Sequence, residues 1–217
     1  MKSYLLFFMI VFSFSRVSGE ELANGMLFPR FEEGTVIYKD GRTVKASLNY
    51  NTVEEEMLFK NPDGSILALD DPGKVSAISI GNRFFEYASR DAFYERIPVD
   101  SVFLYVQWKS TLISEGKGSG YGGRSQAAAV TNIGTLSNQT GNYTRFNLDE
   151  EFKVKSECSY YLKLKNKWKR FNSAKTLGKL FKGHGEEIER FASEENIDFK
   201  NPEDVKRIIA FCSPFIN

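Results

Sequence analysis

The sequence predicts an α+β fold, in which an antiparallel β-meander, rolled or barrel-like, is followed by a β-hairpin and three short C-terminal helices. Three observations predict it. Short stretches of alternating apolar and polar residues run from 35 to 113, separated by hairpin turn sequences. A lysine-rich pair of stretches, joined at Asn166-Lys167, follows at 160–171. Beyond it, apolar residues recur at helical spacing as far as Cys212.

The meander occupies residues 20–114 and is expected to turn at three short sequences. They are Asp40-Gly41, Asn61-Pro62-Asp63-Gly64 and Gly81-Asn82. Gly and Asn tolerate the positive φ of tight hairpin loops, so each turn should join two antiparallel neighbours, and sequential pairing is the economical topology. Within 75–80 the alternation slips by one residue between Ala77 and Ile78, which indicates either a bulge or burial on both faces.

Residues 148–217 are predicted to hold the basic hairpin and the helices as the C-terminal part of the same domain. Ser173 is the expected N-cap of the first helix and Gly183 its C-terminal stop, and a second helix should run from about 185 to 196. The third helix combines a cap, an N-terminal proline and an apolar stripe, namely Asn201, Pro202, and Val205, Ile208, Ile209 and Cys212.

Residues 115–147 are rich in Gly, Ser, Thr and Asn and hold few large side chains. Such a segment cannot bury enough apolar area to offset its ordering entropy, so we expect a long flexible loop. Residues 118–123 match the G-x-G-x-x-G pattern of dinucleotide sites. A surrounding meander and the lack of a later strand ending in an acidic residue argue against that site, and we expect no cofactor.

Residues 1–19 are predicted to be a signal peptide. Lys2 precedes an uncharged run of 11 residues at 4–14, whereas a membrane-spanning helix needs about 20. Val17 and Gly19 suit a cleavage site, so the mature chain is expected to begin at Glu20. No later run is long enough to span a bilayer, so we expect an exported protein of the periplasm or cell surface with no transmembrane segment after cleavage.

The net charge and the scarcity of histidine argue against several classes of function. Loss of Lys2 and Arg16 with the signal peptide would leave 27 basic residues against 28 acidic ones, and this near-neutral balance argues against a nucleic-acid partner. His184 is the only histidine and is expected in an exposed turn between helices. With no C-x-x-C spacing either, neither a metal site nor a catalytic residue is predicted.

The two cysteines, Cys158 and Cys212, are candidates for a disulfide. An oxidising compartment favours the bond, which would pin the last helix to the sheet. Two separately buried thiols are the alternative, because cysteine is among the most buried residue types.

The basic hairpin is the predicted binding surface. Its candidate ligand-binding residues are Tyr161, Lys163, Lys165, Trp168 and Arg170. Tyr161, Lys163 and Lys165 alternate with apolar neighbours and should share one strand face, which could attract an anionic glycan, a lipid headgroup or an acidic envelope protein. The alternative is a solvated face whose lysines discourage edge-to-edge aggregation.

Three segments resemble small exported proteins of Gram-negative bacteria that are uncharacterised. They are residues 34–51 with 54–59, the loop 120–130, and residues 197–209. The resemblance covers most of the mature chain and implies an envelope location. Its motifs are turns and caps, so it implies no catalytic residue and no established activity.

Together these observations predict a non-enzymatic binding or assembly module of the cell envelope. The alternative is a carboxylate-dependent hydrolase of envelope or dietary glycans, in which two acids from different strands meet in a cleft walled by Trp108 or Trp168. The adjacent acids in 32–33, 54–56 and 70–71 do not make such a pair by themselves, because neighbours on a strand point to opposite faces.

Overall fold

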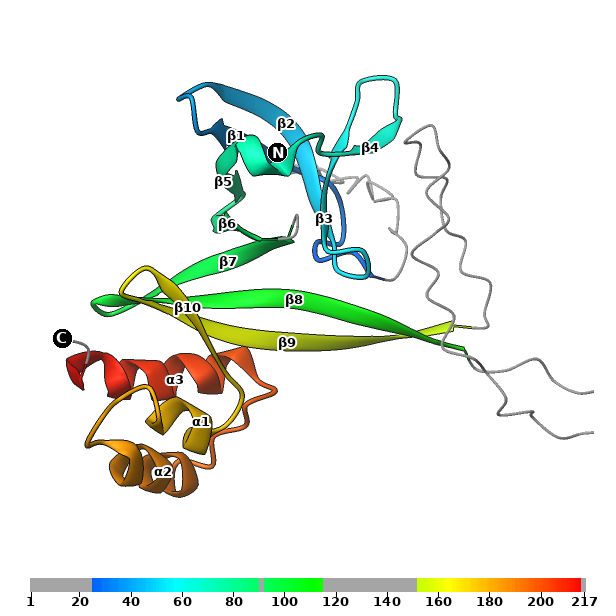
Figure 1. Ribbon diagram of the computed structural model, residues 1–217. Coiled ribbons are helices and arrows are strands. Elements are labelled where there is room, and N and C mark those ends of the chain that lie inside the picture. The colour runs from blue at the N-terminus through cyan, green and yellow to red at the C-terminus, as the bar shows by residue number, and fades with distance from the viewer. Residues whose placement is uncertain (1–24, 90–91, 115–151, 216–217) are drawn as a thin grey trace, which may run out of the picture.

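A computed structural model of the chain describes residues 25–89, 92–114 and 152–215 (Figure 1). Within these ranges the fold is α+β, with one ten-stranded antiparallel sheet and three α-helices. The predicted signal peptide and the whole of the predicted loop at 115–147, with its G-x-G-x-x-G motif, lie outside the described residues.

The strands follow the predicted alternation closely. They are β1 (Glu32–Tyr38), β2 (Thr43–Asn51), β3 (Glu56–Lys60), β4 (Ile66–Ala68), β5 (Val75–Ile80), β6 (Arg83–Ser89), β7 (Ala92–Val99), β8 (Val102–Ser114), β9 (Phe152–Leu164) and β10 (Lys167–Phe171). The predicted turns join β1 to β2, β3 to β4 and β5 to β6. Gly41, Gly64 and Gly81 have φ values of 87°, 88° and 55°, as hairpin turns of this kind require.

Sequential pairing is wrong at one connection. The strand order is β10-β9-β8-β7-β6-β5-β1-β2-β3-β4, so β5 pairs with β1 rather than with β4. Val75, Ile78 and Ile80 of β5 are fully buried, whereas β4 has three residues that are all half-buried. Placing β5 between β1 and β6 buries these side chains and leaves the short strand β4 at the edge. A short edge strand exposes few unpaired backbone groups to which another chain could bind.

The slip of alternation in β5 is a bulge. Ile37 of β1 faces Ala77 and Tyr38 faces Val75, so the register skips Ser76. Ser76 is exposed while Val75 and Ile78 are buried, which shows how the extra residue restores the inward direction of both apolar side chains.

The sheet curls without closing into a barrel. Its edges are β4 and β10, but the turn after β2 bends back to β8, where the Ser110 N–H donates to the Thr52 carbonyl oxygen at 2.8 Å. The curl encloses an apolar cluster, here called the curl core. It consists of Phe28, Val36, Leu48, Tyr50, Met57, Val75, Ile78, Ile80, Phe85 and Phe93.

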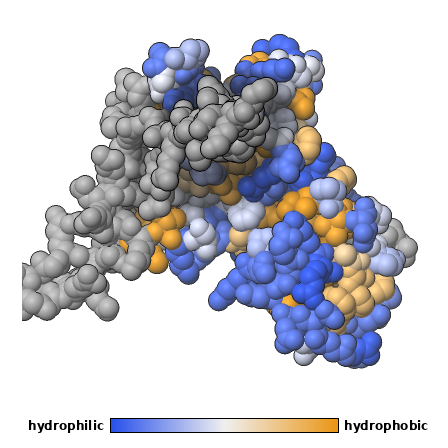
Figure 2. Space-filling view, turned by 180° about the vertical axis from the view of Figure 1, so that it is seen from behind, coloured by the Kyte–Doolittle hydropathy of each residue, from blue (hydrophilic) through white to orange (hydrophobic). Residues whose placement is uncertain are grey.

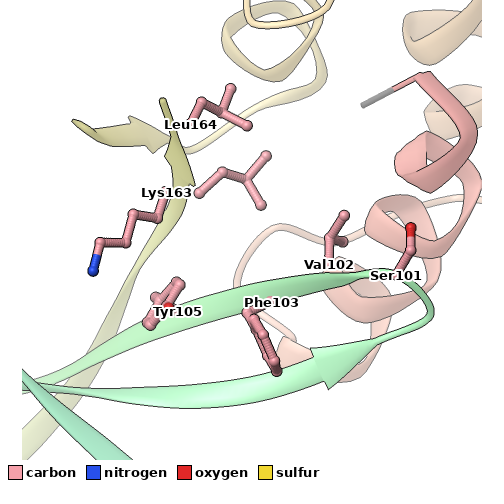
Figure 3. A pocket seen from close by; sticks show the side chains of 7 residues that line it. Ser101, Val102, Phe103, Tyr105, Lys163 and Leu164 are labelled. Atoms are coloured by element: carbon pink, nitrogen blue, oxygen red, sulfur yellow. The ribbon is translucent and has the colours of Figure 1, made fainter. Parts of the chain in front are cut away.

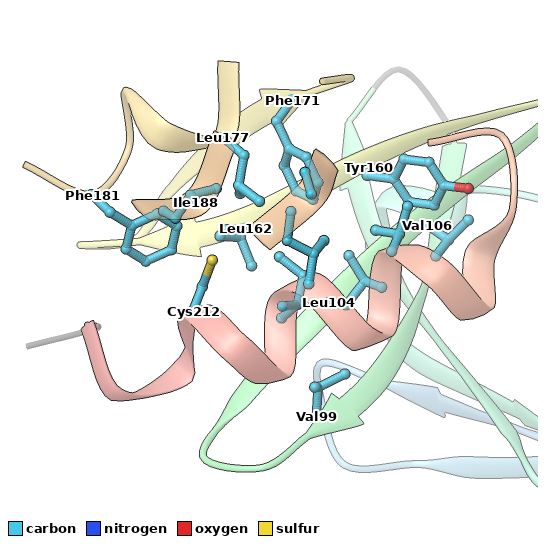
Figure 4. Packing of buried hydrophobic residues seen from close by; sticks show 14 residues of the cluster. Val99, Leu104, Val106, Tyr160, Leu162, Phe171, Leu177, Phe181, Ile188 and Cys212 are labelled. Carbon is cyan, nitrogen blue, oxygen red and sulfur yellow. The ribbon is translucent and has the colours of Figure 1, made fainter. Parts of the chain in front are cut away.

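Three helices cover one face of β8, β9 and β10 (Figures 1 and 4). They are α1 (Ala174–Gly178), α2 (Gly185–Glu194) and α3 (Pro202–Cys212). Inward residues of the strands pack against the helices to form the helix core. Its buried members are Val99, Leu104, Val106, Tyr160, Leu162, Phe171, Leu177, Phe181, Ile188, Ala192, Val205, Ile208, Ile209 and Cys212. The covered face is broad because β9 begins at Phe152, well before the predicted hairpin at 160–171, and pairs with β8 along its length.

The predicted helix starts are confirmed, but the predicted end of the first helix is wrong, because α1 ends at Gly178 and not at Gly183. Ser173 and Thr176 form a capping box at the start of α1, and the Asn201 side chain accepts from the Glu203 N–H at 3.0 Å at the start of α3. Gly183 has a φ of 88° between α1 and α2. These contacts satisfy helix-end donors locally, which is why the sequence alone could locate them.

The predicted disulfide between Cys158 and Cys212 is wrong, because both residues are free thiols in the structure. Cys212 is the last residue of α3 and points into the helix core (Figure 4). Cys158 lies on β9, two residues before Tyr160, and pairs in register with Trp108 of β8. Figure 4 places Tyr160 and Cys212 toward opposite ends of α3, so the length of the helix separates the thiols.

Candidate functional site

The strand face opposite the helices carries the candidate site. Cross-strand registers place alternate residues of β6 to β10 on this face, here called the aromatic–cationic face. Its members are Phe84, Glu86, Tyr94, Arg96, Phe103, Tyr105, Gln107, Tyr161, Lys163, Trp168 and Arg170.

An aromatic cluster forms the centre of this face. The Trp168 ring lies edge-on to Tyr105 and Tyr94, with centroids 4.7 Å and 5.4 Å away, and 6.5 Å from Tyr161. Tyr94 stacks on Tyr161 with centroids 4.6 Å apart. Edge-on and offset contacts of this kind are the favourable arrangements of aromatic rings. They anchor the edge strand β10 to β7, β8 and β9.

One carboxylate organises the charges beside the cluster. Glu86 accepts from Arg96 Nη1 at 2.7 Å and from the Tyr105 hydroxyl at 3.3 Å, and its other close cation is Lys163, whose Nζ lies 3.9 Å away. Lys163 Nζ also lies 5.0 Å from the Trp168 ring centroid, within cation–π range. Two cations share this carboxylate, so the group carries a net positive charge.

The two central tyrosine hydroxyls are held in their neutral form. Burial, followed by the Glu86 carboxylate, raises the pKa of Tyr105 to about 12. Burial, followed by a hydrogen bond with Tyr161, raises the pKa of Tyr94 above its ordinary value. At neutral pH these groups therefore act as hydrogen-bonding hydroxyls and not as bases.

The structure brings together three of the five predicted ligand-binding residues, namely Tyr161, Lys163 and Trp168. Arg170 pairs in register with Tyr161 and lies at the margin, where its Nη2 donates to Ser159 Oγ at 3.0 Å. Lys165 lies outside this face. It occupies the tight turn before β10 with a φ of 48°, and its side chain is exposed.

Reasoning from the hairpin alone missed the half of the site that other strands contribute. Glu86, Arg96 and Tyr105 come from β6, β7 and β8 and reach the hairpin only through sheet registers. A signal for Tyr105 was present, since Phe103, Tyr105 and Gln107 alternate with the inward Leu104 and Val106. The role of Glu86 had no local signal, because its partners are distant in sequence.

A second carboxylate, Glu95, lies on the opposite face of the sheet. Arg83 donates to it through Nε and Nη2, both at 2.6 Å, and Trp108 Nε1 donates at 2.7 Å. The Arg83 guanidinium carbon also lies 4.9 Å from the Phe28 ring and 5.2 Å from the Trp108 ring. This ion pair is enclosed by aromatic rings at the border of the curl core, so it connects β6, β7 and β8.

Glu86 lies beside Trp168 through Lys163, and Glu95 accepts from Trp108, but these two carboxylates cannot serve one cleft. Glu86 faces Tyr94 across β6 and β7, and Glu95 is the next residue after Tyr94. Successive residues of a strand point to opposite faces. The sheet therefore separates the two acids.

Three further features of the described part of the chain concern a metal site, a reactive histidine and a membrane-spanning helix. There, no group of three or more His, Cys, Asp or Glu side chains could hold a metal ion. His184 lies before α2, half-buried, stacked on Phe215 with ring centroids 3.9 Å apart and with Nδ1 3.3 Å from Glu187 Oε2. No helix in the described ranges has the length and apolar character needed to cross a bilayer.

Comparison with known proteins adds no family. Neither a protein-family model, nor a curated protein, nor a solved structure matches this chain.

Proposed function

We propose that this chain is an exported binding module of the cell envelope or cell surface, and that its aromatic–cationic face binds an anionic glycan. The observation that carries the proposal is Lys163 positioned over the Trp168 ring at 5.0 Å, in a group whose two cations share one carboxylate. A ligand that offers both an apolar surface and a negative charge would contact both features.

Glycans of uronic acids combine these two properties. The C–H faces of sugar rings are apolar and can pack against aromatic side chains, while their carboxylates attract ammonium and guanidinium groups. Phe103 and Phe84 extend the apolar surface, with 45% and 46% of their areas exposed. Lys165 and Arg170, both exposed, lie near the same hairpin and strengthen the attraction of an anion to it.

The hydrolase alternative gains no support from Glu86 and Glu95. It requires two carboxyl groups that face each other across roughly 5 to 10 Å, one of them with a raised pKa. Glu86 and Glu95 point to opposite faces, and each already binds an arginine at 2.6 to 2.7 Å. Binding without turnover is therefore the activity that we propose.

The glycan proposal is tested by isothermal titration calorimetry. Oligogalacturonate should bind the protein, whereas a neutral oligosaccharide of equal length should bind at least tenfold more weakly, and added salt should weaken only the former. Lys163→Gln should weaken oligogalacturonate binding roughly tenfold, the scale of one charge-assisted hydrogen bond. Lys200→Gln, an exposed lysine before α3, is the matched control.

Three outcomes would overturn the glycan proposal. They are equal affinity for the neutral sugar, equal effects of Lys163→Gln and Lys200→Gln, or binding confined to vesicles of anionic lipid. Wild-type affinity for oligogalacturonate in the Trp168→Ala variant, with its fold intact by circular dichroism, would show that aromatic packing is not part of the contact.

The export proposal has its own test. The predicted signal peptide at 1–19 implies that protein recovered from the periplasm or culture medium begins at Glu20, which intact-mass spectrometry measures directly. Recovery of protein that retains Met1 would contradict both the cleavage site and the envelope location.

A further inference from the structure

A pocket opens where β8 and β9 part (Figure 3). Pairing of the two strands ends at Leu104 and Leu162, although β8 begins two residues earlier and β9 continues for two more. β8 is held there by β7 and β9 by β10, so the two hairpins diverge as units. The resulting space measures about 290 Å³ and is lined by Ser101, Val102, Phe103, Tyr105, Leu162, Lys163 and Leu164.

The pocket leads from the aromatic–cationic face to the helix core. Val102, Leu162 and Leu164 all pack in the helix core and give the pocket an apolar floor. Phe103 and Lys163 belong to the outer face and form the rim. In Figure 3 the side chains of Val102 and Leu164 lie on the opposite side of the strands from those of Phe103 and Lys163. The space therefore has apolar side chains at its floor and a charged side chain at its entrance.

The charge at the entrance is positive. Lys163 Nζ lies 3.9 Å from Glu86, and the Arg96 guanidinium carbon lies 4.8 Å from the Phe103 ring. Glu86 is bound more closely by Arg96, at 2.7 Å, than by Lys163. The Lys163 ammonium therefore keeps most of its capacity to pair with an incoming anion.

We infer that this pocket binds a small anionic amphiphile, with a short alkyl chain between the two hairpins and a carboxylate against Lys163. The volume is at the lower end of small-molecule sites, which span roughly 300 to 1,000 Å³, so it suits a short chain. Lys163 and Tyr105 are shared with the proposed glycan surface, but the inference depends on the pocket and not on glycan binding.

The test is calorimetric titration of the full chain with decanoate below its critical micelle concentration. Decanoate should bind, and each methylene removed on going to octanoate and hexanoate should weaken binding roughly fourfold. Decanol, which lacks the charge, should bind roughly tenfold more weakly than decanoate. Lys163→Gln should abolish this difference, whereas Lys167→Gln, an exposed lysine of the same hairpin, should preserve it.

Filling the pocket should remove alkyl binding. Leu164→Phe should lower decanoate affinity at least tenfold, and Ser101→Phe, at an exposed lining position, gives the same test with less risk to the helix core. Wild-type decanoate affinity in a folded Ser101→Phe variant, or affinity that does not vary with chain length, would overturn the inference. Oligogalacturonate binding by Ser101→Phe should be unchanged, so failure of this inference is separable from failure of the glycan proposal.

Discussion

Thr52, in the turn after β2, and Ser110 of β8 are joined across the curl of the sheet through both main chain and side chain. The Ser110 N–H donates to the Thr52 carbonyl at 2.8 Å, and their hydroxyls share a hydrogen bond of 2.8 Å across a sequence separation of 58. Both residues are buried. Pairing of β7 with β8 ends at Glu95 and Val106, so the turn after β2 takes over the edge of β8 beyond that point.

Ser110→Ala should lower the free energy of unfolding by about 1 kcal/mol, the net contribution of a hydrogen bond of this kind. The backbone bond remains, and Thr52 Oγ1 keeps its bond to the Gly25 carbonyl at 2.6 Å, so the loss stays modest. Urea denaturation measures it. The control is Ser156→Ala, at the exposed position of β9 that pairs in register with Ser110. Equal losses of unfolding free energy in the two variants would contradict a special role for the Thr52–Ser110 contact.

Arg83→Met should destabilise the protein by about 3 kcal/mol, because Glu95 would remain as a buried carboxylate without its cation. The further change Glu95→Gln should restore much of this loss, since an amide keeps an oxygen for the Trp108 N–H without a buried charge. Arg42→Met is the control: its partner Asp40 is exposed, so its effect should stay below about 1 kcal/mol. No recovery in the double variant would show that the ion pair itself is not the cause.

Gly34→Ala should destabilise the curl by roughly 1–3 kcal/mol, the usual range for overpacking. A Cβ at Gly34 would lie 2.4 Å from the Ser79 carbonyl oxygen, on the neighbouring strand β5, and 2.7 Å from Leu48 Cδ1. At Gly73 the nearest atom would be 3.7 Å away, so Gly73→Ala serves as the comparison. Thermal unfolding should rank the variants in this order, and the reverse order would be inconsistent with the packing of β1.

Stability should fall as the pH rises above about 8.5, the ordinary pKa of a thiol. Burial raises the pKa of Cys212 to about 12 and also raises that of Cys158. The unfolded state then loses protons that the folded state keeps, so each step upward in pH favours unfolding until the folded thiols ionise. Buried tyrosines add to the loss of stability above pH ~10, the ordinary pKa of tyrosine, because burial raises the pKa of Tyr105 to about 12.

Equilibrium urea denaturation across pH 8 to 11 checks this sign. Cys212→Ala should flatten the first part of the decline, whereas stability that is constant or rising over this range would refute it. Two thiols titrated in unfolded, non-reduced protein would match the free cysteines of the structure.

Local chemistry made most of the elements predictable. Gly41 and Gly81 mark turns by their own backbone freedom, and Ser173 and Asn201 cap helices through donors two or three residues away. Such contacts involve neighbouring residues, so their pattern is visible in a linear sequence.

The remainder depended on contacts between distant segments. No residue in or beside β5 indicates that this strand pairs with β1. Likewise, the contacts of Lys163 can be identified only once the register of β9 with β8, and of β8 with β7, is known. The hairpin prediction therefore identified Tyr161, Lys163 and Trp168 but left out Glu86, the acid that positions the lysine. The predicted disulfide between Cys158 and Cys212 was wrong for the same reason. The distance between the two cysteines depends on how α3 packs on the sheet, and the sequence alone does not show this packing.

The position of Trp108 has a consequence for the order in which this chain folds. Its indole packs against both the curl core and the helix core, so β8 belongs to two apolar clusters at once. Hairpins such as β5–β6 and β9–β10 need only short loops to close, whereas the Thr52–Ser110 contact must wait for a far larger loop and its greater entropy cost. Because neither cluster is complete before β8 is in place, the slow step of folding should be the arrival of this strand, and its amides should be among the last to exchange with solvent deuterium.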